Sequence, residues 1–285
     1  MNVAAHATNG TARLDGDEKG SNLFIASVSS FDDTASRAIM DTLVEWIETH
    51  YREDLLKRPS KHVYLRKLPA SVIAQIDYLR DSDPIRERIL RQFPKGHVIT
   101  PMKHTDELYI SHYNKDLGGD QGLYDKHYDG NLRFLSYGAV VRALIYLQSD
   151  ATYKVVFQDS QLEHAFVSYE FGLLDFHREL HWVEGEYNPN DRQRILLKCN
   201  YLITPRLGGF PGRAISVANT AVFYVVKAAM EYSKSPSNPL QQFVGLLCNL
   251  FRLLNNFHPG APLALIAIKL LLVLWIAYHL IWSAP

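Results

Sequence analysis

The fold is decided by residues 140–203, which read VVRALIYLQSDATYKVVFQDSQLEHAFVSYEFGLLDFHRELHWVEGEYNPNDRQRILLKCNYLI. This segment holds short runs rich in Val, Ile, Tyr and Phe, the residue types enriched in β-strands. Serine, aspartate, asparagine and proline stand between the runs and favour tight turns. With one earlier run, the pattern predicts strands over Leu108–Tyr113, Val140–Leu147, Tyr153–Phe157, His164–Tyr169, Phe171–Phe176 and Arg194–Ile203. Many short strands joined by tight turns are typical of an antiparallel sandwich or barrel.

Two helical segments precede these strands. Apolar residues recur at helical spacing from Ser30 to about Glu53, and Asp32 to Thr34 can cap that helix. A second helical pattern runs over Pro69–Phe93, and we expect Asp83-Pro84 to interrupt it, because proline disfavours a helical conformation in the preceding residue. The helices are expected to cover one face of the strands. The predicted fold class is therefore mainly β with flanking helices.

Changes in composition divide the chain into four parts. Its beginning is small, polar and glycine-containing, and the region after Pro205 contains a glycine-rich linker followed by apolar helix candidates. The last part is an apolar run with a single Lys and a single His. We predict a disordered tail over 1–21, the main domain over 22–205, a linker with amphipathic or apolar helices over 206–262, and a transmembrane helix over 263–282.

The C-terminal segment Leu263–Trp282 matches a bilayer in length, since a helix of this size spans about 30 Å. Trp275, Tyr278 and Trp282 gather toward its end, where an interfacial aromatic belt is expected. Lys269 opposes this interpretation, because its charge must reach the interface or find a partner. The alternative is a buried core helix. On the membrane interpretation the protein is tail-anchored, with the main domain on the cytosolic side.

The overall composition excludes several classes of protein. The chain has 285 residues, 47% of them hydrophobic, which is enough for a sizeable core. Thirty basic side chains balance thirty acidic ones, so no net positive charge favours nucleic acid as a partner. Only Cys199 and Cys248 are present, too few for a secreted disulfide scaffold. The first twenty residues contain no apolar run, so we expect no signal peptide.

The triplet His127-Tyr128-Asp129 is the strongest indication of chemistry. On a β-strand, residues two apart point to the same face, so an imidazole and a carboxylate would lie side by side. One more imidazole completes a two-histidine, one-carboxylate facial triad, which leaves coordination positions open on iron(II). Taken alone, a His-x-Asp triplet is more often a turn carboxylate beside an unrelated histidine. Here a candidate third ligand, His181, follows about fifty residues later, ahead of a glycine turn at Gly185.

The order His-x-Asp, a distant His, a glycine turn and a basic residue opening an apolar strand resembles the prolyl 4-hydroxylase-type branch of the iron(II)- and 2-oxoglutarate-dependent oxygenases. The resemblance covers roughly Glu107–Ile203. It implies a double-stranded β-helix, a jelly-roll barrel, to which this chain adds a helical, hydrophobic C-terminal tail. It also implies that His127, Asp129 and His181 hold the iron.

The same resemblance implies a set of residues around the co-substrate. Arg194 matches the basic residue that pairs with the far carboxylate of 2-oxoglutarate, and Arg192 is its rival. Alternation along the strand favours Arg194, since Leu196, Lys198 and Asn200 follow it on one face. Tyr113 resembles a tyrosine that helps to hold the carboxylate, and Tyr124 fits the spacing of a residue that lines the site. The Gly-Gly-Glu-Thr type motif that the family often carries is absent from Thr152–Phe157.

Family chemistry predicts hydroxylation of an unactivated C–H bond with O₂ and 2-oxoglutarate, and it allows ascorbate as an accessory reductant. Peptidyl proline is the substrate implied by the resemblance, whereas the apolar tail suggests a lipid or another small hydrophobic molecule. A second alternative is a membrane-tethered barrel without catalysis. A third is a zinc hydrolase using His177 and His181, but Glu179 stands at the wrong offset for the known zinc-peptidase motifs.

Overall fold

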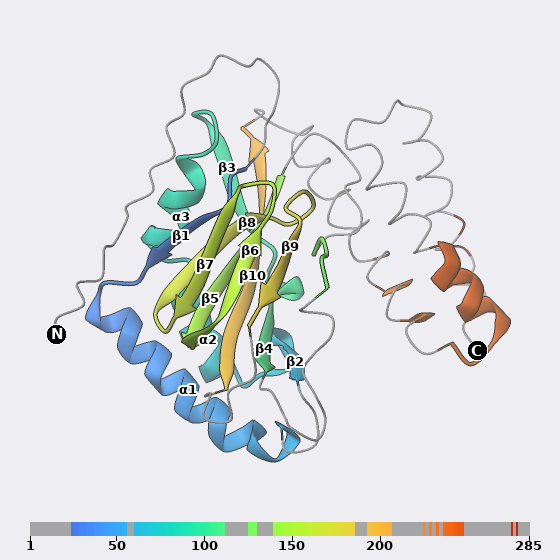
Figure 1. The fold of residues 1–285 in the computed structure, drawn as a ribbon, viewed down its shortest axis with the longest axis horizontal. Helices are drawn as coiled ribbons and strands as arrows, with labels where there is room; N and C mark the ends of the chain where they lie inside the picture. Colours follow the sequence, from blue (N-terminus) through green and yellow to red (C-terminus); the bar gives the residue numbers. More distant parts are fainter. Residues whose placement is uncertain are drawn as a thin grey trace.

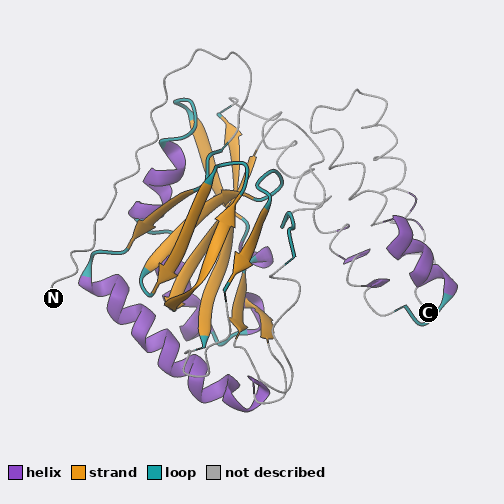
Figure 2. Cartoon of the chain, in the orientation of Figure 1, coloured by secondary structure: helices purple, strands orange, loops and turns teal. Residues whose placement is uncertain are grey.

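A computed structural model describes residues 24–55, 60–111, 125–129, 139–185, 193–206 and 236–247, together with Val225, Ala228, Ala229, Tyr232, Ser233, Trp275 and Tyr278. Two antiparallel sheets form its centre, with helices on one side (Figures 1 and 2). The predicted tail over 1–21 lies outside the described residues, as do almost all residues of the predicted segment Leu263–Trp282. The part of the chain that is described therefore confirms a mainly β class.

The major sheet has seven strands. Its order is β1-β8-β5-β10-β4-β2, and β3 also pairs with the end of β10. The strands are β1 (Ser27–Ser30), β2 (Ser60–Tyr64), β3 (His97–Pro101), β4 (Glu107–Ser111), β5 (Ala139–Gln148), β8 (Glu170–Asp175) and β10 (Arg194–Pro205). The long strand β10 pairs with β5 along one side, and with β4 and then β3 along the other. It is therefore a central support of the sheet.

The second sheet is smaller and has the order β7-β6-β9. Its strands are β6 (Asp150–Phe157), β7 (Leu162–Val167) and β9 (His181–Glu184). Apolar side chains from both sheets pack together between them, among them Tyr109, Tyr146, Phe157, Phe166 and Leu196. This shared layer makes the β-structure a two-sheet sandwich.

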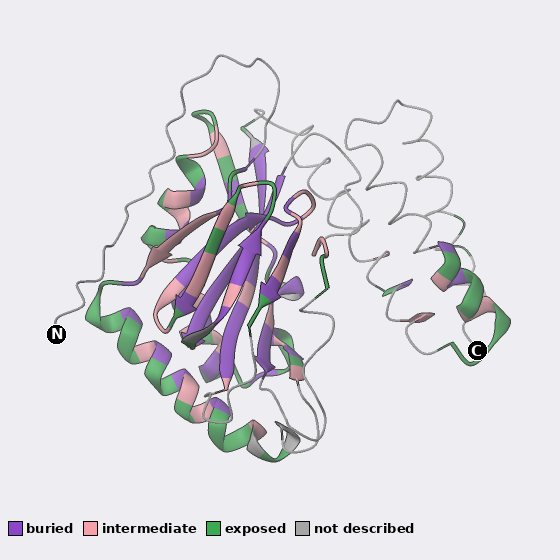
Figure 3. Ribbon diagram, viewed as in Figure 1, coloured by how far each residue is buried: buried purple, intermediate pink, exposed green. Residues whose placement is uncertain are grey.

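The helices cover the other face of the major sheet. They are α1 (Thr34–Leu55), α2 (Ala70–Arg80) and α3 (Asp83–Leu90), with the short 3₁₀ turns η1 (Leu65–Lys67) and η2 (Lys103–Thr105) between elements. Their apolar stripes join the outward residues of β10, namely Ile195, Leu197, Cys199, Tyr201 and Ile203, in one buried cluster. The helix α1 is buried on its sheet-facing side and exposed on the other (Figure 3).

Two helix boundaries differ from those predicted from the sequence. Residues Ser27–Ser30 form the edge strand β1, and α1 begins only after Asp33, whose carboxylate accepts the backbone N–H of Ser36 at 2.7 Å. The predicted break at Asp83-Pro84 falls slightly earlier, at the extended residue Ser82. Proline lacks a backbone N–H and is tolerated in the first turn, so Pro84 starts α3 instead of ending α2.

Among the described residues, no helix is both long enough and apolar enough to cross a membrane. Residues 239–247 are helical and lie within the region 206–262, where amphipathic or apolar helices were predicted. Of the predicted transmembrane segment, only Trp275 and Tyr278 are described. The transmembrane helix remains a prediction.

Candidate metal centre

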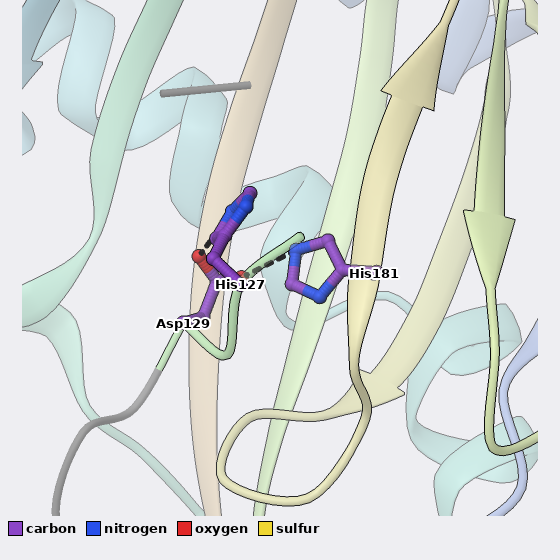
Figure 4. Close-up of side chains that lie close together, drawn as sticks. All are labelled: His127, Asp129 and His181. Carbon is purple, nitrogen blue, oxygen red and sulfur yellow. Dashed lines mark ion pairs between the residues drawn. The ribbon is translucent and has the colours of Figure 1, made fainter. Parts of the chain in front are cut away.

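The three predicted ligands converge at one point. The ligand atoms of His127, Asp129 and His181 all lie within 4.8 Å of one another, and all three side chains point toward one another (Figure 4). No other His, Cys, Asp or Glu cluster of this kind occurs in the described part of the chain. The structure thus brings together residues that are more than fifty positions apart in the sequence.

A backbone pairing holds the two histidines together. His127 and His181 exchange both backbone hydrogen bonds, each at 3.0 Å, and their ring centroids are 4.5 Å apart. The prediction that the His127–Asp129 triplet lies on a strand was wrong, because His127 forms only an isolated bridge and Asp129 lies in a bend. The bridge to β9 therefore places the first histidine, and the bend turns the carboxylate toward both rings.

Hydrogen bonds to carbonyl groups fix both rings. The Nδ1 atom of His127 lies 2.7 Å from the carbonyl oxygen of Asp125, and that of His181 lies 3.1 Å from the carbonyl oxygen of Glu179. Since a carbonyl can only accept, both Nδ1 atoms carry the proton and both Nε2 atoms keep a lone pair. Those Nε2 atoms lie 3.9 Å and 3.5 Å from the carboxylate oxygens of Asp129. Metal-binding histidines are typically oriented in this manner.

The protonation states also suit a metal. Burial lowers the pKa of His181 to about 4, so its ring is neutral at pH 7. Burial alone would raise the pKa of Asp129, but the guanidinium of Arg142 holds it well below its usual range, so Asp129 is a carboxylate. Metal ligands must be neutral imidazoles and ionised carboxylates. The residues present therefore fit a divalent cation with two nitrogen ligands and one oxygen ligand.

Arg194 is a buried cation on the face of the major sheet that is turned toward the smaller sheet. Arg194 is buried at the start of β10, with its guanidinium 5.8 Å from the ring centroid of Tyr109. Its Nε is buried without a hydrogen-bond partner among the described residues. Burial raises the pKa of the neighbouring Tyr146 to about 12, which keeps its hydroxyl protonated beside Arg194. A buried guanidinium with an unsatisfied N–H is costly and suits an anionic ligand.

Lys198 lies on the same face of β10, but it already has a partner. Its Nζ is 3.3 Å from Glu107 and 4.6 Å from the ring centroid of Tyr109. The alternation predicted along β10 is confirmed, because Leu196 packs between the two sheets whereas Ile195 and Leu197 pack under the helices. Arg194 is thus the described cation on this face that is left for a ligand.

Several predicted site residues lie outside the described part of the chain, namely Tyr113, Tyr124 and Arg192. The alternative zinc site required His177 and His181 to share the face of a helix, but residues 176–178 form a turn, and the ligand cluster does not include His177. Glu179 has a structural role instead: it accepts the backbone N–H groups of Asp159 and Ser160 and the hydroxyl of Ser160. It thereby ties the segment before His181 to the turn between β6 and β7.

Sequence reasoning missed Arg142, which contacts a metal ligand, and the role of Asn200, which contacts Arg142. The Nη1 atom of Arg142 lies 2.8 Å from Asp129, and its Nε donates to the side chain of Asn200 at 3.0 Å. A signal for Arg142 was present, since it is the one charged residue in the otherwise apolar run VVRALIYL. A charge in a buried strand needs a partner.

Comparisons with known proteins gave distant structural matches. No protein-family model matches the chain, and no curated protein matches it in sequence. A Trichoplax adhaerens prolyl hydroxylase in complex with a hypoxia inducible factor peptide is 14% identical; the match covers 62% of this chain and 82% of that one, with a TM-score of 0.42. A Pseudomonas putida prolyl-4-hydroxylase is 16% identical, with coverage of 64% and 92% and a TM-score of 0.37.

A third match is HygX from Streptomyces hygroscopicus with nickel and 2-oxoglutarate bound. It is 10% identical, the match covers 64% of this chain and 83% of that one, and the TM-score is 0.38. At such values, likeness alone decides neither fold nor function, which rest on the geometry of this chain. In structure, the chain resembles the iron(II)- and 2-oxoglutarate-dependent oxygenases, prolyl hydroxylases among them.

Proposed function

We propose that this chain is an iron(II)- and 2-oxoglutarate-dependent dioxygenase that hydroxylates an unactivated C–H bond. One observation carries the proposal: the ligand atoms of two imidazoles and one carboxylate converge within 4.8 Å of one another at the edge of a two-sheet β-sandwich. This ligand set leaves one side of the metal free for a co-substrate and O₂. The arrangement of facing antiparallel sheets supports a double-stranded β-helix as the finer description of the fold.

Each residue has a separate task in the proposed reaction. His127, Asp129 and His181 would hold the iron, and Arg194 would bind the far carboxylate of 2-oxoglutarate through charge-assisted hydrogen bonds. Tyr146 keeps its proton beside Arg194 and can donate to the same carboxylate. When bound, iron and 2-oxoglutarate supply the oxidation of C–H to C–OH by O₂, while 2-oxoglutarate becomes succinate and CO₂. Ascorbate would serve only as an accessory reductant.

The layer between the sheets excludes water from this space. Tyr109, Leu144 and Leu196 are buried on the face of the major sheet that carries Arg194, and Phe157 faces them from the smaller sheet. In a site from which water is excluded, ionic contacts to the co-substrate are stronger than in bulk solvent.

Peptidyl proline is the proposed substrate class, supported by the order of motifs in the sequence. A small hydrophobic or lipid substrate is the second candidate, and one observation favours it. Phe243, Leu246, Trp275 and Tyr278 of the C-terminal region all expose more than a third of their surface. Exposed aromatic and aliphatic side chains of this kind are typical of surfaces that meet a membrane or an apolar ligand.

The test is substrate-dependent succinate formation. Purified protein would be supplied with iron(II), 2-oxoglutarate and O₂, and then with prolyl peptides or with lipids and small hydrophobic molecules. We expect one class to raise succinate formation above the substrate-free rate, with matching growth of a product 16 Da heavier, the mass of one oxygen atom. The Asp129→Ala variant should form no succinate. Metal binding without succinate formation under any condition would favour the non-catalytic barrel.

A further inference from the structure

The carboxylate of Asp129 carries a partner that iron ligation does not itself require. The Nη1 atom of Arg142 lies 2.8 Å from Oδ1 of Asp129, and the two side chains are only 8% and 11% exposed. The other oxygen, Oδ2, lies 3.5 Å from Nε2 of His181. Each oxygen has a ligand histidine near it, since Nε2 of His127 lies 3.9 Å from Oδ1, but Oδ1 alone also forms the ion pair with Arg142.

Arg142 is itself held from two further directions. Its Nε donates to Oδ1 of Asn200 at 3.0 Å, and these two residues are directly opposite each other in the β5–β10 register. Its guanidinium also stacks on the ring of Phe176, with 4.4 Å to the ring centroid. A guanidinium that is fixed by a hydrogen bond, an ion pair and an aromatic ring has little freedom to follow a moving carboxylate.

Asn200 is equally fixed. Its side-chain amide donates to the carbonyl oxygen of Thr105 at 3.2 Å and to the hydroxyl of Thr105 at 2.9 Å. Its backbone N–H donates to the carboxylate of Asp106 at 2.8 Å, and Asp106 forms an ion pair with Arg80 of α2. A continuous chain of polar contacts therefore runs from helix α2 through β10 and β5 to the metal ligand.

We infer that Arg142 is a positioning residue, which binds one oxygen of Asp129 and so directs the other to the metal. This inference rests on the proposed function. Stability alone does not explain the pair, because buried ion pairs are often no more stable than apolar residues of the same size. Partners that orient a metal ligand, in contrast, typically change metal affinity by about 10- to 100-fold when they are removed.

The inference is tested by titrating metal-free protein with Co(II) and following the visible ligand-field spectrum. Arg142→Met removes the ion pair but keeps an unbranched apolar stem, and we expect the Co(II) Kd to rise about 10- to 100-fold with an altered spectrum. Asn200→Ala leaves the ion pair but removes its anchor, so a smaller rise is expected. Arg88→Met is the matched control, since Arg88 donates to the carbonyl oxygen of Val28, far from the metal ligands.

A second variant keeps the test decisive if Arg142→Met does not fold. Arg142→Lys retains the charge, but a single ammonium is a poor substitute for a planar fork that bridges Asp129 and Asn200. It should therefore fold and still raise the Kd. A merely structural role would lower the melting temperature of the metal-free variants without changing their Co(II) affinity or spectrum. That outcome, or a Kd within twofold of wild type in folded Arg142→Met or Arg142→Lys, would overturn the inference.

The result also separates this inference from the proposed function. If wild-type protein bound Co(II) no better than Asp129→Ala, the metal centre itself would be wrong. If wild type bound tightly, Asp129→Ala did not, and Arg142→Met matched wild type, only the role of Arg142 would be wrong.

Discussion

Single atoms decide what the site can bind. Each ligand histidine keeps Nε2 free because its Nδ1 hydrogen is directed to a backbone carbonyl, that of Asp125 or of Glu179. Arg194 is available to an anion because the neighbouring Lys198 already neutralises Glu107. At this scale, the atoms that have partners and those that do not make the proposed site suited to a divalent cation and an anionic ligand.

Arg194 gives the first prediction at this scale. Arg194→Ala should raise the apparent KM for 2-oxoglutarate by about 10- to 100-fold, because a charge-assisted hydrogen bond contributes about 1.5–3 kcal/mol. Arg192→Ala is the control and should change this KM little. Steady-state kinetics with 2-oxoglutarate as the varied substrate gives the ranking. If the effects of the two substitutions were reversed, the assignment would move two residues along the chain.

Asp106 gives a pH-dependent prediction. Burial raises its pKa to about 6, although the Asn200 amide and Arg80 act against this rise. Its neutral form is therefore favoured in the folded state, and its contribution to stability is present near pH 4 and lost as pH rises through about 6. The difference in free energy of unfolding between wild type and Asp106→Asn should therefore decrease by about 3 kcal/mol as pH rises from about 4 to above 6. Urea denaturation at several pH values measures the difference, and a pH-independent difference would contradict the assignment.

Much of the site could be predicted from residue types and spacing, because metal chemistry restricts the choice. His127, Asp129, His181 and Arg194 were all identified from the sequence, and the structure places the first three in one cluster. Asn200 could not be identified in this way. Its role depends on lying opposite Arg142 across two paired strands, and strand register is not encoded in either strand alone.

At the scale of elements, β10 organises the molecule. Its odd-numbered residues from Ile195 to Ile203 pack under the helices and Leu196 packs between the two sheets, so one strand serves two apolar layers. The long apolar strands were predictable from composition. The strands β1, β2 and β3 were not, because each is short and partly polar and is formed by pairing with β8, β4 or β10. Their sequences, such as SVSS in β1, carry little intrinsic preference for a strand.

Gly172 of β8 gives a prediction about packing between strands. A Cβ at this position would lie 2.6 Å from Cζ of Phe166, whose ring stacks on Tyr146 with centroids 4.2 Å apart. Gly172→Ala should therefore lower the free energy of unfolding by about 1–3 kcal/mol through overpacking. Denaturant unfolding would measure this loss. In the background of Phe166→Leu, whose side chain is shorter, the same substitution should cost less; an equal cost in both backgrounds would exclude the clash.

At the scale of the whole molecule, two sheets and a layer of helices position the site, while the C-terminal segment would determine its location. The main domain is mainly β, as its composition predicted. For Leu263–Trp282 the prediction of a tail anchor, with the catalytic domain in the cytosol, stands as a proposal. Exposed Trp275 and Tyr278 support it.

The membrane proposal predicts that the full-length protein sediments with membranes and resists extraction with carbonate. A chain that ends near Pro205 should remain in the supernatant and still bind iron and 2-oxoglutarate, because every proposed ligand precedes that residue. Fractionation followed by immunodetection distinguishes the two forms. Full-length protein that stayed monomeric in solution without detergent would refute the membrane anchor.

The central claim is that iron(II) is held by His127, Asp129 and His181 and chelates 2-oxoglutarate there. Its most direct test is anaerobic titration of the protein with iron(II) and then 2-oxoglutarate, while the metal-to-ligand charge-transfer absorption of the chelate is recorded. We predict that wild type and His177→Ala develop this absorption at one equivalent of iron, and that His181→Ala develops none while remaining folded. Absorption that persisted in His181→Ala, or that was absent from wild type, would contradict the metal centre described here.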